Sequence, residues 1–124
     1  MIRKDFIQRH LDELANVIAV VLQLKNNLKP VEAEAKINDF ANDFLGLSFD
    51  ELINVNGSLV DYLIAKHKFT LTHFKVLEDL LYHKHLFNTT DNHLNEITLE
   101  VLNYVAKNDT SYSFERVNRI NQIK

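Results

Sequence analysis

A chain of 124 residues, of which 46% are hydrophobic and 25% charged, is long enough to bury one core, so we expect a single globular domain. Two glycines and one proline are too few for the turns of an all-β fold, and the absence of cysteine excludes disulfides, cysteine zinc sites and thiol nucleophiles. The net charge of −3 gives no general attraction to nucleic acid or to an anionic membrane.

The first predicted element is a long helix over residues 5–25. Apolar residues recur along it at steps of three and four positions in two adjacent stripes, which make a face broader than one neighbouring helix requires. Such a face fits either the buried centre of a monomer or a surface that binds a partner or a second copy. The residues that we expect to form this interaction face are Phe6, Leu14, Val17, Ile18, Val21 and Leu22.

Pro30 suits the first position of the next helix, and Gly46 suits the position just after its end. The residues of this helix that we expect to point inward are Val31, Ile37, Phe40, Ala41 and Phe44. Ser48 and Glu51 then form a capping box, which predicts a short helix over about residues 49–55.

Residues 59–124 predict a series of helices joined by short polar loops, and short loops make neighbouring helices antiparallel. Ser58 starts the first of them, and Thr70 either caps a second helix or lies inside one continuous helix. A last helix begins after Ser113. The residues expected inward on the helices over 71–87 and 93–107 are Phe74, Leu77, Leu80 or Leu81, His85, Leu94, Ile97, Val101, Leu102 and Val105.

Several chemistries lack support in this sequence. Its two glycines are eleven positions apart, so neither a dinucleotide fingerprint nor a P-loop can form, and the serine nucleophile elbow is absent. Carboxylates that could be proposed as catalytic pairs are better interpreted as solvated helix faces, and these are Asp12 with Glu13 and Glu96 with Glu100. The apolar stretch over residues 14–24 is too short to span a bilayer.

Three of the six histidines lie between residues 80 and 93, which raises the question of a metal site. His83 and His85 are two apart and point about 200° away from each other on a helix. The pairs that do share a helix face are Asp79 with His83 and His93 with Glu96, and these four residues are the candidate metal ligands. The simpler interpretation puts His83 and His85 in the last turn of a helix, where a positive charge is favourable, with Asp79 and His83 as a surface pair.

Basic and aromatic residues alternate over residues 65–75, a pattern that could bind single-stranded nucleic acid through Lys66, Lys68 and Lys75. Phe69 and Phe74 have helical spacing, however, and are better interpreted as core residues. We therefore expect no nucleic-acid partner.

Three stretches carry a resemblance to a known family: MIRKDFIQRHLDELANVIAVVL, DFLGLSFDELI and TLEVLNYVAKNDTSYSFERVNRINQI. Together they make the chain similar, over nearly its whole length, to small bacterial proteins of unknown function with tetratricopeptide-like helical pairs toward the C-terminus. Residues that fall roughly where such repeats place their packing side chains are Leu77, Leu81, Leu102 and Ala106. The resemblance implies an all-helical array and supplies no catalytic residues.

We therefore predict an all-α fold, an antiparallel array of six or seven helices, with N-terminal helices over residues 1–58 and a tetratricopeptide-like array over 59–124. The predicted function is a non-enzymatic protein–protein interaction or scaffold domain, located in the cytoplasm and without a cofactor. Its partner would be another protein or a second copy in a homodimer. The alternative hypothesis is a small metal-dependent sensor or enzyme that uses Asp79, His83, His93 and Glu96.

Overall fold

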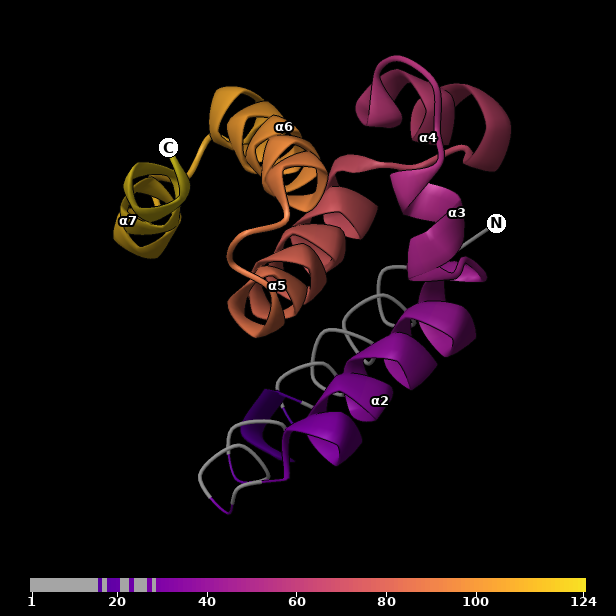
Figure 1. The fold of residues 1–124 in the computed structure, drawn as a ribbon. Helices are drawn as coiled ribbons and strands as arrows, with labels where there is room; N and C mark the ends of the chain where they lie inside the picture. Colours follow the sequence, from indigo (N-terminus) through magenta and orange to yellow (C-terminus); the bar gives the residue numbers. More distant parts are fainter. Residues whose placement is uncertain (1–15, 17, 21–22, 24–26, 28) are drawn as a thin grey trace. The chain divides into compact units, whose positions relative to one another are not determined.

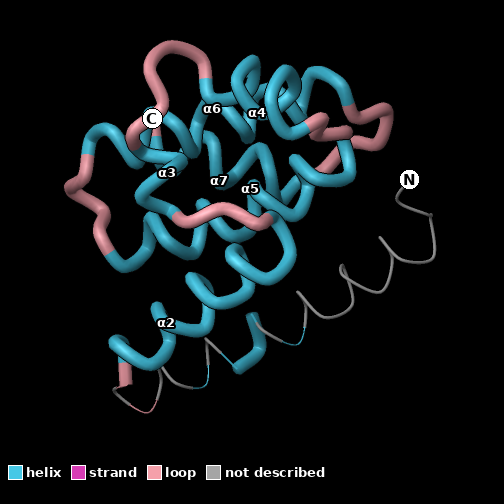
Figure 2. The backbone as a smooth tube through the Cα atoms, turned by 90° about the vertical axis from the view of Figure 1, so that its right-hand side faces the viewer, coloured by secondary structure: helices cyan, strands magenta, loops and turns pink. Residues whose placement is uncertain are grey.

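The computed structural model of the protein describes residues 16, 18–20, 23, 27 and 29–124, and these residues form an all-α fold without a strand (Figures 1 and 2). The chain divides into two compact units, Met1–Phe49 and Asp50–Lys124, which are described separately below. We expected the N-terminal helices to extend to residue 58. The second unit begins earlier because Glu51 already contacts Tyr62 and His67, which lie further along the chain.

In the first unit, the described residues of the predicted long helix are helical; they are Asn16, Ile18–Val20 and Gln23. Ile18 is half-buried, and the other five residues of the predicted interaction face lie outside the described residues. Helix α2 spans Pro30–Phe40 and continues as one turn of π-helix, η1, over Ala41–Leu45. The predicted start at Pro30 is confirmed. Gly46 ends the segment with φ of 68°, a left-handed conformation that favours glycine.

The inward face of α2 agrees with the prediction at three positions and disagrees at one. Ile37, Phe40 and Ala41 are buried, whereas Val31 is 80% exposed. Val31 precedes Ile37 by six positions, which is about 240° around a helix, so it points away from the buried stripe. Ala33, four positions before Ile37, takes the inward place instead. The side chain of Phe44 lies outside the described part of the chain.

The second unit contains helices α4 to α7, preceded by the short helix α3 at the division between the units. Their bounds are Phe49–Ile53 for α3, Leu59–His67 for α4, Leu71–Phe87 for α5, Asn92–Asn108 for α6 and Phe114–Ile123 for α7. No helix among the residues that the structure describes has the length and apolar character needed to cross a membrane.

Local capping residues set the starts of these helices. Ser58 and Ser113 each accept a hydrogen bond from the backbone N–H three residues on, as predicted. Of the two possibilities for Thr70, a cap or a position inside one continuous helix, the structure has the cap, and a separate helix begins after it. The N–H of Thr70 donates to Nδ1 of His73 at 3.0 Å, so the histidine completes a capping box in which a glutamate is usual. Lys68, with φ of 57°, makes the sharp break before it.

Helices α5 and α6 run antiparallel and side by side in the centre of this unit (Figure 1). The rings of Phe74 and Tyr104 meet near one end of the pair with centroids 4.7 Å apart, and Nδ1 of His85 donates to Oδ1 of Asn95 at the other end. The inward faces predicted for both helices are confirmed, because all of the named residues are buried, including both Leu80 and Leu81. Helices α4 and α7 each pack against α6.

Candidate functional site

The candidate site lies where α6 connects to α7. A pocket of about 360 Å³ opens there, and it is lined by Ala106, Asp109, Thr110, Ser111, Tyr112, Ser113, Arg116 and Val117. Hydroxyl groups and an aromatic ring thus share its wall with the aliphatic side chains of α6 and α7. A concave surface of this mixed character can hold an apolar side chain and orient it by a few hydrogen bonds.

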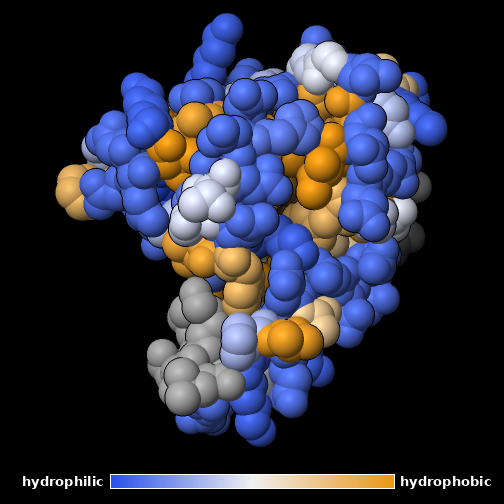
Figure 3. Space-filling model, viewed as in Figure 1, coloured by the Kyte–Doolittle hydropathy of each residue, from blue (hydrophilic) through white to orange (hydrophobic). Residues whose placement is uncertain are grey.

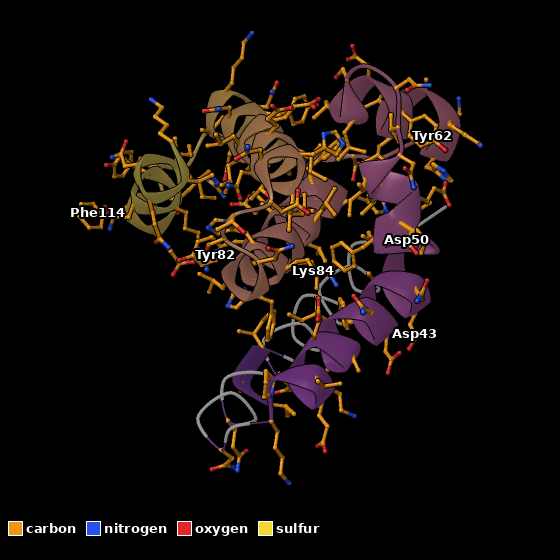
Figure 4. The ribbon with its side chains drawn as sticks, in the orientation of Figure 1. Asp43, Asp50, Tyr62, Tyr82, Lys84 and Phe114 are labelled. Atoms are coloured by element: carbon orange, nitrogen blue, oxygen red, sulfur yellow. The ribbon has the colours of Figure 1, made fainter. Side chains whose placement is uncertain are left out.

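Two large aromatic side chains are exposed to solvent here: Tyr112, which lines the pocket, and Phe114, which follows the lining residue Ser113 in the chain. Tyr112 is 78% exposed and Phe114 is 69% exposed, and Figure 4 shows Phe114 pointing outward from the start of α7. Ser113 between them caps α7 by accepting the N–H of Arg116 at 3.1 Å. On the face shown in Figure 3, most of the surface is hydrophilic and the hydrophobic residues form separate patches. Among the phenylalanine and tyrosine side chains that the structure describes, Tyr112 and Phe114 are the two that are exposed.

A group of paired charges at the pocket joins α5, α7 and the connection between α6 and α7. Nε and Nη2 of Arg116 donate to the two carboxylate oxygens of Glu78 at 2.7 and 3.1 Å, a bidentate contact between buried side chains. Nη1 of Arg116 lies 3.6 Å from Oδ2 of Asp109, which also pairs with Nζ of Lys75 at 3.1 Å. Through Asp109 the network holds the connection between α6 and α7, and through Arg116 it holds helix α7.

The two acids of this network have opposite pKa shifts. Burial raises the pKa of Glu78 above its usual value, and the hydrogen bond from Arg116 offsets part of that effect. The backbone N–H of Ser111, at 3.1 Å, and the Lys75 ammonium lower the pKa of Asp109. Both carboxylates are thus engaged by donors of the chain itself.

A second arginine, Arg119, lies one turn further along α7. It pairs with Asp79 on α5 and, at 2.9 Å, with Glu115 on its own helix, and its guanidinium lies 4.3 Å from the ring centroid of Tyr82. The Tyr82 hydroxyl in turn donates to Oε1 of Gln122 at 2.9 Å. Contacts at positions 78, 79 and 82 of α5 therefore match positions 116, 119 and 122 of α7, so the two helices run parallel.

The structure divides the four candidate metal ligands between two helices. Asp79 and His83 lie on α5, where Asp79 pairs with Arg119 and Nδ1 of His83 donates to the Asp79 backbone carbonyl at 2.9 Å. His85 lies in the last turn of α5, as the simpler interpretation expects, but the expectation that Asp79 and His83 form a surface pair is wrong, because His83 is buried. His85 faces α6 because it lies on the apolar stripe with Phe74 and Leu81.

His93 and Glu96 lie at the start of α6. Nε2 of His93 donates to the carbonyl of Ile53 at 2.6 Å, and its Nδ1 lies 3.8 Å from Oε2 of Glu96. His93 thus ties the start of α6 to α3. Within the described residues, no three histidine, aspartate or glutamate side chains gather as a metal ion would require.

The three lysines of the basic stretch each contact a different group of the chain. Lys75 pairs with Asp109, Nζ of Lys68 donates to the Ala65 carbonyl at 3.1 Å, and Nζ of Lys66 lies 5.4 Å from the ring centroid of Tyr62. Phe69 and Phe74 are buried and contact each other, which confirms their interpretation as core residues. Stacking of bases on these two rings is therefore blocked by the protein itself.

Glu100, which the sequence places on a solvated helix face, has a structural task. Its carboxylate accepts the Ser58 hydroxyl at 2.6 Å and the N–H groups of Leu59 and Val60 at 3.2 and 2.8 Å. A negative charge at this point complements the positive end of the α4 dipole. A residue of α6 thus caps the start of α4.

Sequence reasoning did not identify Glu78, Arg116 or the exposed aromatic pair. A signal for the first two was present, because Glu78 lies on the apolar stripe of α5 and Arg116 shares a helix face with Ile120 and Ile123. A charged residue at an inward position predicts a buried partner of opposite charge. The identity of that partner depends on how the helices pack, so local periodicity cannot supply it.

Comparison of the chain with known protein families, with characterised proteins and with solved structures finds no match. The resemblance to small bacterial proteins with tetratricopeptide-like helical pairs therefore stays a prediction, and the site is interpreted from its own geometry.

Proposed function

We propose that this protein is a non-enzymatic protein–protein interaction domain and that it contacts its partner through the aromatic site, defined as Tyr112, Phe114 and the pocket beside them. The observation that carries the proposal is the exposure of both aromatic side chains next to a concave surface. Exposed apolar surface costs free energy in water, and a partner that covers it recovers that cost.

Three properties of the aromatic site support this proposal. Tyrosine and phenylalanine are enriched in protein interfaces, where they supply large contact areas for few rotatable bonds. The pocket beside them can receive a side chain of the partner. The helix cap at Ser113 and the ion pairs of Arg116 and Asp109 hold the backbone beside the aromatic pair in place within the chain.

The test compares two double variants of the tagged full chain. Tyr112→Ser with Phe114→Ser removes the aromatic pair, while Val31→Ser with Ile64→Ser removes two exposed aliphatic residues elsewhere. Proteins retained by the wild type and the control, and lost by the aromatic variant, are purified and titrated against all three chains by calorimetry. We expect the aromatic variant to weaken binding at least about tenfold, since buried aromatic anchors often cost more than 1 kcal/mol when truncated. Equal affinities of the three chains would contradict the proposal.

Self-association through the predicted interaction face around residues 6–22 is a separate prediction, since five of its six residues lie outside the described residues. Light scattering of the wild type and of a Val17→Asp/Val21→Asp variant tests it. A mass near twice 14.5 kDa for the wild type, a monomer mass for the variant and equal helix content by circular dichroism would support the dimer. A variant that unfolds would identify the face as core.

We further propose that the helices from residue 59 onward form a tetratricopeptide-like array and that the protein acts in the cytoplasm of a bacterium. The antiparallel α5–α6 pair supports the first part, since such a pair is the unit of these arrays. The absence of cysteine fits the reducing conditions of the second part.

A further inference from the structure

Helix α7 packs against α6, and its contacts with α5 are made by charged and polar groups. Among the ten described residues of α7, Arg116 is the most buried, at 9% exposed, and it is an ion. Arg119 adds a second pair three positions on, so two arginines on one face of α7 meet Glu78 and Asp79, which are adjacent on α5. This contact is specific, because a helix without that spacing of positive charge leaves two acids without partners.

A contact of this kind is selective but not strongly stabilising. The attraction between paired buried ions is largely offset by the loss of their hydration, so separation returns hydration to Arg116 and to Glu78. An apolar contact of the same size has no such compensation when it opens. The charged part of the α7 contact should therefore open at a lower cost than an apolar contact of the same size would, while the charges still determine where α7 can dock again.

The connection between α6 and α7 adds an independent observation. Its residues between the two helices run from Asp109 to Ser113, and the exposed aromatic pair lies in it and just after it. If α7 crossed to another copy of the chain, the two connections would lie next to each other. Tyr112 and Phe114 of both copies would then cover one another, which gives their exposed apolar surface a partner.

We propose that α7 is exchangeable, so that α7 of a second copy docks on the Glu78–Asp79 face of α5 in place of the chain's own helix. The inference rests on the proposed function, because it names a second copy of this chain as an occupant of the aromatic site. The site of contact is defined by four charged residues, Glu78 and Asp79 on α5 and Arg116 and Arg119 on α7.

Reciprocal charge reversal tests this exchange on the full chain. Asp79→Arg and Arg119→Asp each place two like charges at the α5–α7 contact, both within the chain and within a dimer of identical chains. In a mixed pair that exchanges α7, each α7 instead meets a charge of opposite sign. We expect native mass spectrometry of an isotopically labelled mixture to show a mixed dimer that associates about tenfold more tightly than either variant alone.

A matched control separates this effect from general charge attraction. Glu96→Arg changes the net charge as Asp79→Arg does, but its side chain is exposed at the start of α6. A mixture of Glu96→Arg with Arg119→Asp should show no preference for mixed pairs. A preference as strong as in the first mixture, or no preference in either, would overturn the proposal.

A second measurement covers the case in which a reversed chain loses its helix content. A fluorescent peptide of residues 109–124 is titrated against the full chain carrying Arg116→Ala and Arg119→Ala. We expect saturable binding that falls at least about tenfold when Glu78→Ala and Asp79→Ala are added. A peptide that binds both chains equally, or neither, contradicts the exchange.

Failure of the exchange and failure of the proposed function give different results. If the mixtures stay monomeric while Tyr112→Ser with Phe114→Ser still loses a protein partner, the aromatic site binds a different protein and α7 stays in its own chain. If the mixed dimer forms but no other partner depends on the aromatic pair, self-assembly is the function of the site.

Discussion

Helix α5 makes two contacts of opposite character within the second unit. Toward α6 it presents apolar residues and ordered rings, with Phe74, Leu77 and Leu81 fully buried. Toward α7 it presents Glu78, Asp79 and Tyr82, which meet two arginines and a glutamine. The same helix is therefore joined to one neighbour by hydrophobic burial and to the other by paired charges.

This difference separates stability from specificity. Apolar burial gains free energy in proportion to area and is indifferent to small changes of register. A bidentate arginine–carboxylate pair contributes little net free energy, but it accepts one register and penalises the others. We infer that the α5–α6 pair carries most of the stability of this unit and that the α5–α7 contact determines where α7 docks.

The largest effect that we expect breaks the charged contact from one side. Arg116→Met leaves the Glu78 carboxylate buried without its bidentate donor, and it should lower the free energy of unfolding by about 3–5 kcal/mol. Adding Glu78→Met removes both ions and should restore the stability of the wild type or exceed it by up to about 4 kcal/mol. Urea unfolding of the four chains in this cycle measures both values. A double variant that is less stable than Arg116→Met would refute the account of the charged contact.

The apolar contact is tested by Leu102→Ala, which deletes buried methyl groups on α6. Leu102 is fully buried, so the loss of transfer free energy and the remaining cavity should cost about 2–5 kcal/mol. The loss in Arg116→Met should be restored by removing a second charge. The loss in Leu102→Ala should not be restored by any substitution that only removes a charge. Phe114→Ala serves as the control, since an exposed side chain should change the stability by less than about 0.5 kcal/mol. Thermal and urea unfolding give the comparison.

A smaller effect concerns the carboxylate that α6 provides to α4. Glu100→Gln keeps the size of the side chain but removes the charge that accepts two backbone N–H groups and the Ser58 hydroxyl. We expect a loss of about 1–2 kcal/mol and faster amide exchange at the start of α4. Glu96→Gln, on the same helix but exposed, is the matched control. Hydrogen exchange that rises equally in both variants would show that Glu100 does not act as a cap.

The smallest effect concerns pH. Burial lowers the pKa of His73 below its ordinary value of 6.5, and its Nδ1 accepts the Thr70 N–H, which only the neutral ring can do. The unfolded chain then binds the proton more readily, so this stability is present above pH 6.5 and is lost as the pH falls through the lowered pKa. His73→Gln keeps a capping box without a titrating group. The melting temperature of the wild type should fall more between pH 7.5 and 5.5 than that of the variant, and parallel curves would exclude the histidine.

Local signals in the sequence were sufficient for most helix boundaries. Pro30, Gly46, Ser58 and Ser113 act on backbone groups within four residues of themselves, so their effects can be seen without knowledge of the fold. The inward faces of α5 and α6 were also predictable, because a long helix samples its apolar stripe several times. The prediction failed at Val31, which lies in the first turn of α2.

The contacts of the candidate site were not predictable in the same way. Arg116 and Glu78 are separated by 38 positions, and Glu100 and Ser58 by 42, so each pair depends on the packing of whole helices. The spacing of Asp79 and His83 predicts a surface pair, but packing buries His83 and brings Arg119 to the Asp79 carboxylate. The exposure of Tyr112 and Phe114 was equally hidden, since aromatic residues are most often buried and a sequence does not show which ones are left out.

The cap that Glu100 provides has a consequence for the order of events during synthesis. Residues 59–67 are made and emerge from the ribosome before Glu100 emerges, and at ordinary rates of translation the delay for 42 residues is on the order of seconds. During that time the start of α4 has the Ser58 hydroxyl as its cap, and the carboxylate arrives only with α6. The nascent chain should therefore complete the α5–α6 hairpin first, and α4 should become protected from exchange when the middle of α6 places Glu100 at its start.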